Sequence, residues 1–171
     1  ERRAAAVDVR MVGKVDYDET GVKAITAWAP GRIDRLYVDF TGTRVAEGDH
    51  LVDLYSPELI SAQAELLQAA RSASRTGDGM SDYLRDSTQT TLEATREKLR
   101  LLGLRAEQIE NIEESGEPVT HVTIYSPIGG IVIERTATEG MYVSTGSHIY
   151  TVADLSEVWV DVDVFEQQIG W

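Results

Sequence analysis

Residues 42–51 read GTRVAEGDHL, and residues 140–149 read GMYVSTGSHI. The two stretches share the frame G-x-x-V-x-x-G-x-H-[LI], and the likeness continues on both sides of this frame. Each copy extends over about 30 residues, a period at which self-similarity is typical of paired structural units. Glycines at matched positions between short β-branched runs indicate turns that join short strands. We expect the two half-units to close into one small β-sandwich, because neither half alone could bury a face.

The segment between the two copies has a helical pattern. Ser56 followed by Pro57 is typical of a helix start, with a capping side chain and then proline at the first helical position. Two apolar stripes with 3-4 spacing follow, formed by Leu59, Ala62, Leu66, Ala69 and Ala73, and then by Leu92, Thr95, Leu99 and Leu102. Residues 76–79 interrupt the pattern, Gly103 is a natural helix end, and residues 105–115 predict a short third helix. Isolated helices of this length are marginal in water, so the two stripes should pack on each other.

Both ends of the chain show strict alternation of apolar and polar residues. Residues 7–17 and 157–164 each predict a half-buried strand. The order is therefore strand, half-sandwich, helices, half-sandwich, strand, which describes an elongated spacer better than an enzyme. Because the sequence begins inside a strand-like pattern, we expect it to be a fragment or a processed product.

Composition excludes several classes of function. The chain has 171 residues with 16 basic and 29 acidic side chains, a net charge of −13 that argues against a nucleic-acid partner. It has no cysteine, which removes disulfides, thiolate metal sites and cysteine nucleophiles and fits an oxidising compartment. No apolar run approaches the roughly 18 residues of a membrane span, and no signal peptide is visible at the start.

Four stretches carry a resemblance to a known family. Residues 54–67 (LYSPELISAQAELL), 99–104 (LRLLGL), 125–132 (YSPIGGIV) and 153–160 (ADLSEVWV) are similar to the periplasmic adaptor, or membrane fusion, subunits of resistance–nodulation–division efflux pumps. The heavy-metal branch, and within it the copper/silver adaptors, resembles this chain most. The resemblance extends over nearly the whole sequence, and the order of the motifs is more specific than any one of them.

The resemblance implies a mainly β fold with an α insertion. A split biotinyl-lipoyl-like β-sandwich (25–56 and 120–154) would be interrupted by a helical hairpin or three-helix bundle (57–119). Strands of a partial β-barrel domain (1–24 and 155–171) would flank it. The family also implies further sequence on both sides of this chain.

The resemblance further implies a mechanical function without enzymatic chemistry. A periplasmic adaptor would link an inner-membrane proton-driven transporter to an outer-membrane channel for export of copper, silver or other heavy-metal cations. It would self-associate into a ring and reach the inner membrane through parts absent from this chain. Adaptors of ABC-type or multidrug exporters share the nesting and remain an alternative. The methionines that the copper/silver branch carries near its N-terminus are absent, as is the Arg/Leu/Ser tip signature of many multidrug adaptors.

The far end of the helical hairpin is the candidate contact with the channel. Its small seam residues bury little apolar area, so we expect this end to be the least stable and most mobile part of the chain. Five polar residues are chosen by position alone: Arg71, Arg75, Asp78, Ser81 and Asp82. A solvated tip without a partner is the alternative.

The residues suited to metals or covalent cofactors are scattered, so we expect neither a metal site nor a cofactor. Soft Cu(I) or Ag(I) needs several converging sulfurs, but the methionines fall in three different modules: Met11, Met80 and Met141. Zinc needs three or four converging ligands. His50 and His148 merely occupy equivalent positions of the repeat, and His121 stands alone.

Lysines and glutamates could serve two further functions, and their positions favour neither. A biotin or lipoyl carrier needs a lysine at the hairpin that joins its halves. The lysines of this chain are Lys14, Lys23 and Lys98, and none of them is placed at such a hairpin. An acidic run could hold cations but is more typical of a solvated helix face: Glu107, Glu110, Glu113, Glu114 and Glu117.

Overall fold

The two repeat copies form one β-sandwich, as their glycine and β-branched pattern predicts. The computed structural model describes residues 11–75 and 82–164. It contains two antiparallel four-stranded sheets, ordered β2-β9-β7-β4 and β6-β5-β3-β8, and each sheet takes two strands from each side of the helical insertion. The sandwich strands are β2 (Val22–Thr26), β3 (Gly31–Leu36), β4 (Arg44–Val45), β5 (His50–Tyr55), β6 (His121–Tyr125), β7 (Gly130–Arg135), β8 (Tyr142–Val143) and β9 (His148–Ala153).

Each half-unit gives its shortest strand to the other half. Strand β4 of the first half pairs with β7 of the second, and β8 of the second half pairs with β3 of the first. The turns before these strands make equivalent hydrogen bonds: Gly42 N–H donates to the Val132 carbonyl and Gly140 N–H donates to the Ile33 carbonyl, both at 2.7 Å. Both glycines have positive φ angles, +86° and +79°, which favour glycine at these turns. The pseudo-twofold relation read from the sequence is therefore present in the backbone bonding.

The sandwich core is built from the inward-facing side chains of both sheets. Leu51, Val52, Val132 and Ile149 are fully buried. Tyr150 is also fully buried, and its hydroxyl donates a 2.7 Å hydrogen bond to the Val38 carbonyl across the two halves. Burial raises the pKa of Tyr150 to about 12, because the ionised phenolate would lose its hydration.

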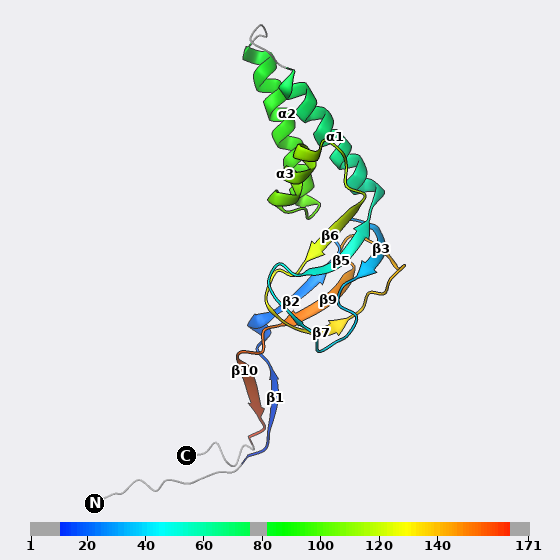
Figure 1. Cartoon of the computed structure of the whole chain (residues 1–171). Coiled ribbons are helices and arrows are strands. Elements are labelled where there is room, and N and C mark those ends of the chain that lie inside the picture. Colours follow the sequence, from blue (N-terminus) through cyan, green and yellow to red (C-terminus); the bar gives the residue numbers. More distant parts are fainter. Residues whose placement is uncertain (1–10, 76–81, 165–171) are drawn as a thin grey trace, which may run out of the picture.

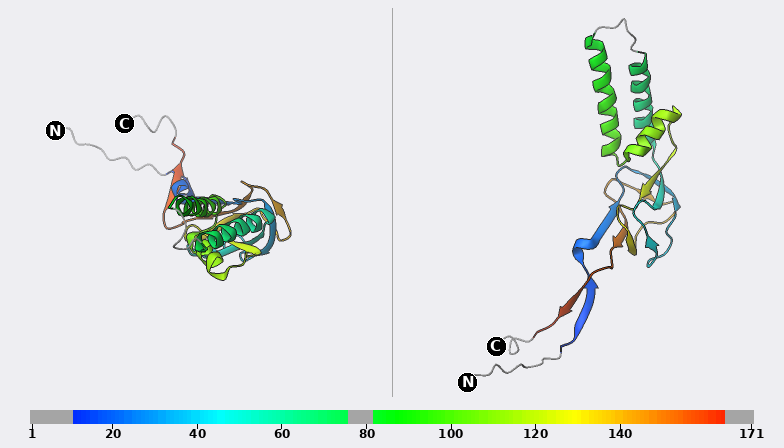
Figure 2. Two further views of the ribbon diagram at one scale, coloured as in Figure 1. Left: turned by 90° about the horizontal axis from the view of Figure 1, so that it is seen from above. Right: turned by 60° about the vertical axis from the view of Figure 1, so that its left-hand side comes forward.

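The helical insertion packs as its apolar stripes predict. It consists of α1 (Pro57–Ser74), α2 (Asp82–Leu101) and α3 (Ala106–Ser115). Ser56 caps α1 by accepting a hydrogen bond from the Leu59 N–H, and Pro57 occupies the first position. Leu66 of α1 and Leu99 of α2 are fully buried where the helices meet. Figure 2 shows α1 and α2 side by side, with α3 leaning across their base.

The molecule is elongated, with the helices at one end and a two-stranded ribbon at the other (Figure 1). The ribbon pairs β1 (Gly13–Tyr17) with β10 (Val158–Val162) and joins the sandwich through a short 3-10 turn (Glu19–Gly21). The sequence predicted half-buried strands here. The strands are present, but the prediction that one face is buried is wrong, because Val15 is 63% exposed and Val160 is 59% exposed. Alternation indicates a strand with two unlike faces, whereas burial requires a second layer, and none covers the ribbon within the described residues.

The predicted fold class is confirmed in its main parts, a split sandwich with helices inserted between its halves and strands flanking it. The flanking strands form an open ribbon rather than a closed barrel within the described part of the chain. The module boundaries proposed from the sequence stay a prediction.

Gly130, where β7 closely approaches β9, gives a direct test of the sandwich. An added Cβ on Gly130, the first residue of β7, would collide with the Ala153 carbonyl oxygen, and one on Gly31, the first residue of β3, would collide with the Tyr55 carbonyl oxygen. Gly130→Ala should lower the free energy of unfolding by about 2 kcal/mol, as overpacking against fixed backbone does. Urea unfolding provides the measurement.

The neighbouring Gly129 supplies the matched control. A Cβ there would lie 3.7 Å from its nearest neighbours, an ordinary van der Waals contact. Gly129→Ala should therefore change stability by less than about 0.5 kcal/mol. Equal losses in the two variants would contradict the close approach of β7 and β9.

Candidate functional site

The structure describes only part of the predicted tip. Arg71 lies in the last turn of α1 and donates a 3.1 Å hydrogen bond to the Gly116 carbonyl, and Arg75 caps the C-terminus of α1. Asp82 begins α2, although its side chain is not described, and Asp78 and Ser81 lie outside the described residues. Contact between these five residues and a channel stays a prediction, and Arg71 has a second role in holding the segment after α3 against α1.

Gln63 holds the same returning segment and was not predicted. Its side chain is fully buried, its Nε2 donates to the Val119 carbonyl at 3.1 Å, and its Oε1 accepts from the Val119 N–H at 2.6 Å. A buried amide that bonds both the N–H and the carbonyl of one residue fixes that segment, because an unpaired buried backbone group is costly. The signal in the sequence was an amide four residues after Leu59, on the side of the first helix that carries the apolar stripe.

Charged pairs tie the three helices together. Arg96 of α2 makes two 2.8 Å hydrogen bonds to Glu113 of α3, and this bonding raises the pKa of Arg96. Lys98 of α2 bonds Glu65 of α1 at 2.6 Å. Glu113 thus has a structural partner, whereas the remaining members of the acidic run are exposed, namely Glu107, Glu110, Glu114 and Glu117.

The three histidines have separate surroundings. His50 on β5 lies edge-on between Tyr37 and Tyr125, with ring centroids 5.4 and 5.0 Å away. His148 on β9, in the other sheet, bonds Thr136 and Thr151 through its two ring nitrogens. The third histidine bonds a carboxylate instead: His121 Nε2 lies 2.8 Å from Asp34 Oδ2.

The methionine and lysine side chains are dispersed over the molecule as the histidines are. Met11 and Met141 are 46% and 39% exposed and lie in different modules, and Met80 falls outside the described residues. No group of three or more histidine or carboxylate side chains suited to a metal ion occurs among residues 11–75 and 82–164. Lysines lie on β1, on β2 and in α2, at Lys14, Lys23 and Lys98.

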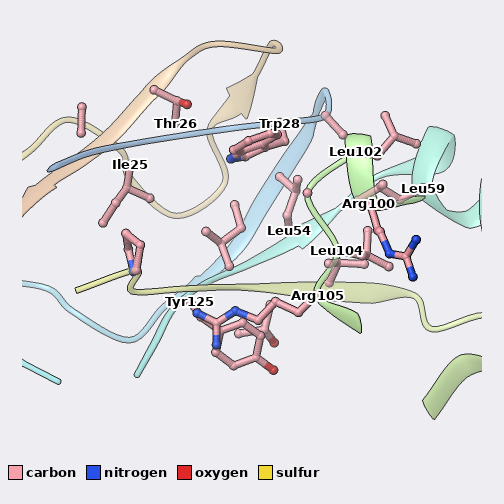
Figure 3. Close-up of a pocket in the computed structure, with 17 residues that line it drawn as sticks. Ile25, Thr26, Trp28, Leu54, Leu59, Arg100, Leu102, Leu104, Arg105 and Tyr125 are labelled. Atoms are coloured by element: carbon pink, nitrogen blue, oxygen red, sulfur yellow. The ribbon is translucent and has the colours of Figure 1, made fainter. Parts of the chain in front are cut away.

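A pocket of about 340 Å³ lies where the feet of the helices meet the sandwich (Figure 3). Leu54 and Ile25 line it from the sandwich, and Leu102 and Leu104 line it from the α2–α3 connection. Gly103, with φ of +91°, lets this connection approach the Trp28 ring, which an added Cβ would meet at 2.8 Å. The pocket is therefore a module junction, whose shape depends on how the helices sit on the sandwich.

Arg105 and Tyr125 line this pocket, and further arginine and tyrosine side chains lie on the sheet face that carries Tyr125. The Arg105 guanidinium lies 4.4 Å from the Tyr125 ring centroid and donates to the Ser126 carbonyl at 3.2 Å. Arg35 lies 4.9 Å from the Tyr37 ring centroid, an arrangement that holds the charged group by cation–π attraction. Guanidinium groups and tyrosines fixed on an exposed sheet face are suited to protein recognition.

None of the helices in the described ranges combines the length and the apolar character that crossing a bilayer requires. This fits the exposed, charge-rich outer surfaces of α1 and α2.

The sequence matches a known protein family over most of its length. Residues 22–153 match the family described as CusB, barrel-sandwich hybrid domain. The cation efflux system protein CusB of Escherichia coli K12 is 28% identical over 159 residues, which cover 92% of this chain and 35% of that protein. The chain spans about a third of the length of the curated relatives that it matches.

Two solved structures share the fold. ZneB from Cupriavidus metallidurans superposes with a TM-score of 0.57 at 19% identity, covering 92% of this chain and 71% of ZneB. A MacA–MexA chimera that contains the Pseudomonas aeruginosa MexA α-hairpin domain gives a TM-score of 0.54 at 26% identity, covering 92% of this chain and 55% of the chimera.

The dispersed ligands predict weak metal binding by this chain. Titration calorimetry with Zn(II), and competition titration with Cu(I) and Ag(I), should detect no stoichiometric site tighter than about 1 µM, because such sites need three or four converging ligands. A tight site that is lost in the double variant His50→Ala, His148→Ala would contradict this expectation.

The Asp34 pair predicts a pH-dependent contribution to stability. Hydrogen bonds from Arg32 and then His121 hold the pKa of Asp34 below its ordinary value. A depressed carboxyl pKa contributes stability above the pKa of the unfolded chain, and this stability is lost as the pH falls through the folded pKa. Asp34→Asn should therefore melt at a lower temperature than the wild type at pH 7, and the difference should disappear near pH 2.

The exposed Asp39, three residues beyond Leu36, serves as the control for this measurement. Asp39→Asn should follow the wild type at both pH values. A deficit in Asp34→Asn that persists unchanged at low pH would mean that the substitution acts through packing rather than through the charged pair.

Proposed function

Because the chain belongs to the family of CusB barrel-sandwich hybrid domains, we propose that it is the central part of a periplasmic adaptor in a heavy-metal efflux pump. The adaptor links an inner-membrane, proton-driven transporter of the resistance–nodulation–division class to an outer-membrane channel. The exported substrate is a heavy-metal cation, in line with a relative named as a cation efflux system protein, and the resemblance of the sequence motifs to copper/silver adaptors favours one of those two metals.

The observation that carries this proposal is the order of modules along one axis. Helices α1–α3 are inserted between β5 and β6, which are neighbours in one sheet, and β1 and β10 leave from the opposite end (Figure 1). Such a chain separates two contact surfaces by the length of the whole molecule, as a connector requires. The scattered histidines and methionines add a second argument, because they suit coupling of two partners better than storage or transfer of the metal.

In this function the three modules have different tasks. The helical hairpin reaches toward the outer-membrane channel, and the ribbon leads toward the inner-membrane partner. The sandwiches of several copies stand side by side in a ring. The adaptor lies in the periplasm and is held at the inner membrane by parts of the protein beyond this chain.

Growth on metals tests the proposal in cells. A strain that lacks the full-length protein should become sensitive to silver, copper or another heavy-metal cation, and the wild-type gene should restore tolerance. A variant that lacks residues 57–119 should fail to restore it although the sandwich halves still pair, because the connector would no longer reach its second partner. Growth on plates with graded metal concentrations gives the measurement.

The Gly129→Ala variant serves as the matched control and should restore tolerance fully. Unchanged metal tolerance in the deletion strain, together with new sensitivity to organic antibiotics, would overturn the metal assignment and favour the adaptor of a multidrug or ABC-type exporter.

A further inference from the structure

The connection between α2 and α3 contacts both halves of the sandwich. On one side Gly103 lies against Trp28, in the loop between β2 and β3: a Cβ added to Gly103 would come within 2.8 Å of the Trp28 Cβ and Cγ atoms. On the other side the Arg105 guanidinium donates to the Ser126 carbonyl at 3.2 Å and lies 4.4 Å from the Tyr125 ring centroid (Figure 3). Trp28 precedes the helical insertion in the chain and Ser126 follows it, so the connection joins the two halves.

The two points of contact belong to equivalent turns of the repeat. Ala27, next to Trp28, exchanges two backbone hydrogen bonds of 2.7 and 2.9 Å with residues 146–147 of the second half. Ser126 exchanges two bonds of 2.9 Å with residues 48–49 of the first half. Because both groups of each peptide position are bonded across the halves, each point of contact is a fixed part of the sandwich.

The connection itself has little conformational freedom. It ends α2 with the bonding pattern of a Schellman motif: the Leu104 N–H donates to the Leu99 carbonyl at 3.1 Å, and the Gly103 N–H donates to the Arg100 carbonyl at 2.9 Å. Arg105 follows directly as the N-cap residue of α3. Any displacement of the connection is therefore passed to both helices.

The two contacts hold the connection from opposite sides of one sheet. The chain enters and leaves the helices through β5 and β6, so its backbone attaches them to only one of the two sheets. Tyr125 lies on the outer face of that sheet, because residues of β6 alternate and Val122 is buried. Arg105 thus holds the connection at the outer face, whereas Trp28 reaches it from the loop that follows β2 of the other sheet.

The pocket of about 340 Å³ beneath the connection makes these two contacts important. Leu102 and Leu104 line it from the connection, and Leu54 and Ile25 line it from the sandwich. A junction packed as densely as a protein interior would resist tilting along its whole length. With a pocket in the middle, the resistance comes from the contacts at its rim.

We propose that Trp28 and Arg105 are positioning residues that set the angle of the helices on the sandwich. This inference rests on the proposed function, in which the connector must place its far end at a second partner. The 20 residues of α2 give a length of about 30 Å, so a tilt of about 10° at its foot moves the far end by about 5 Å. Hydrogen bonds need donor–acceptor distances of about 2.7–3.2 Å, so such a displacement separates polar groups that should meet.

The distance between two spin labels, measured by electron paramagnetic resonance, tests the proposal. The chain has no cysteine, so Asp39→Cys in the sandwich and Asp86→Cys in α2 take the labels without competition, and both positions are exposed. This labelled pair should give a narrow distribution of distances. Trp28→Ala and Arg105→Ala should each broaden the distribution by about 5 Å, because the helices can then tilt toward the released side.

Two further variants are the controls. Arg100→Ala removes another arginine that lines the pocket, but one that bonds Glu97 of its own helix, so the distribution should stay narrow. Trp28→Phe keeps an aromatic ring against Gly103 and should also keep it narrow. Trp28 and Arg105 are exposed, so their truncation leaves the buried core in place, and thermal unfolding checks this. A lower melting temperature with an unchanged narrow distribution would mean that the two residues only stabilise the fold, and would overturn the proposal.

Metal tolerance separates this inference from the proposed function. The full-length protein with both Trp28→Ala and Arg105→Ala should restore less tolerance than the wild type, and Arg100→Ala should restore it fully. A broad distribution together with full tolerance would overturn the importance of the angle for export. A wild type that confers no tolerance to any metal would overturn the proposed function instead, and the label distances would still decide whether the two residues set the angle.

Discussion

Gly42 donates to Val132 and Gly140 donates to Ile33, so each half of the sandwich is closed by the other. The two bonds sit at equivalent turns and bring β4 and β8 onto strands of the opposite half. Because neither half has its full complement of strands alone, the sandwich forms only when both ends of the helical insertion come together. The position of every other module follows from this closure.

The insertion depends on it directly. Tyr55 at the end of β5 pairs with His121 at the start of β6, so the helices leave and return through adjacent strands of one sheet. Gln63 and Arg71 then attach the returning segment to α1. The helices thus stand on a base that the sheet has already fixed, and the pocket beneath them is formed by both modules.

Much of this architecture could be predicted from the sequence, for physical reasons. Matched glycines and β-branched runs specified the sandwich, and Ser56 with Pro57 specified the start of α1. The match of residues 22–153 to the CusB family confirms the resemblance inferred from short motifs. Both signals are local in the chain, or repeated within it, and so are visible without coordinates.

The side chains that meet on the outer face of the sheet β6-β5-β3-β8 could not be predicted in the same way. Their neighbours depend on cross-strand register, and irregularities between Ile33 and Arg35, and between His50 and Val52, shift that register by an amount that no single strand reveals. His50 and His148 occupy equivalent positions of the repeat, but repeated turns fix the backbone and not the side chains that surround each residue. One histidine lies between tyrosines, and the other lies between threonines.

The paired passages between modules have a mechanical consequence. At one end of the sandwich the chain crosses through β5 and β6, and at the other it crosses beside Gly21 and Asp154, which are also hydrogen-bonded to each other. A covalent backbone cannot stretch appreciably, so two strands side by side resist tilting within the plane that contains them, since one would have to lengthen. Tilting about the line that joins the two strands meets no such resistance. The passage beside Gly21 and Asp154 therefore favours bending about a single axis, whereas the passage to the helices is also held by Arg105 and Gln108, which donate to the Ser126 and Thr123 carbonyls. Displacement of the ribbon is thus passed to the sandwich in a defined direction, and the sandwich and helices follow it together.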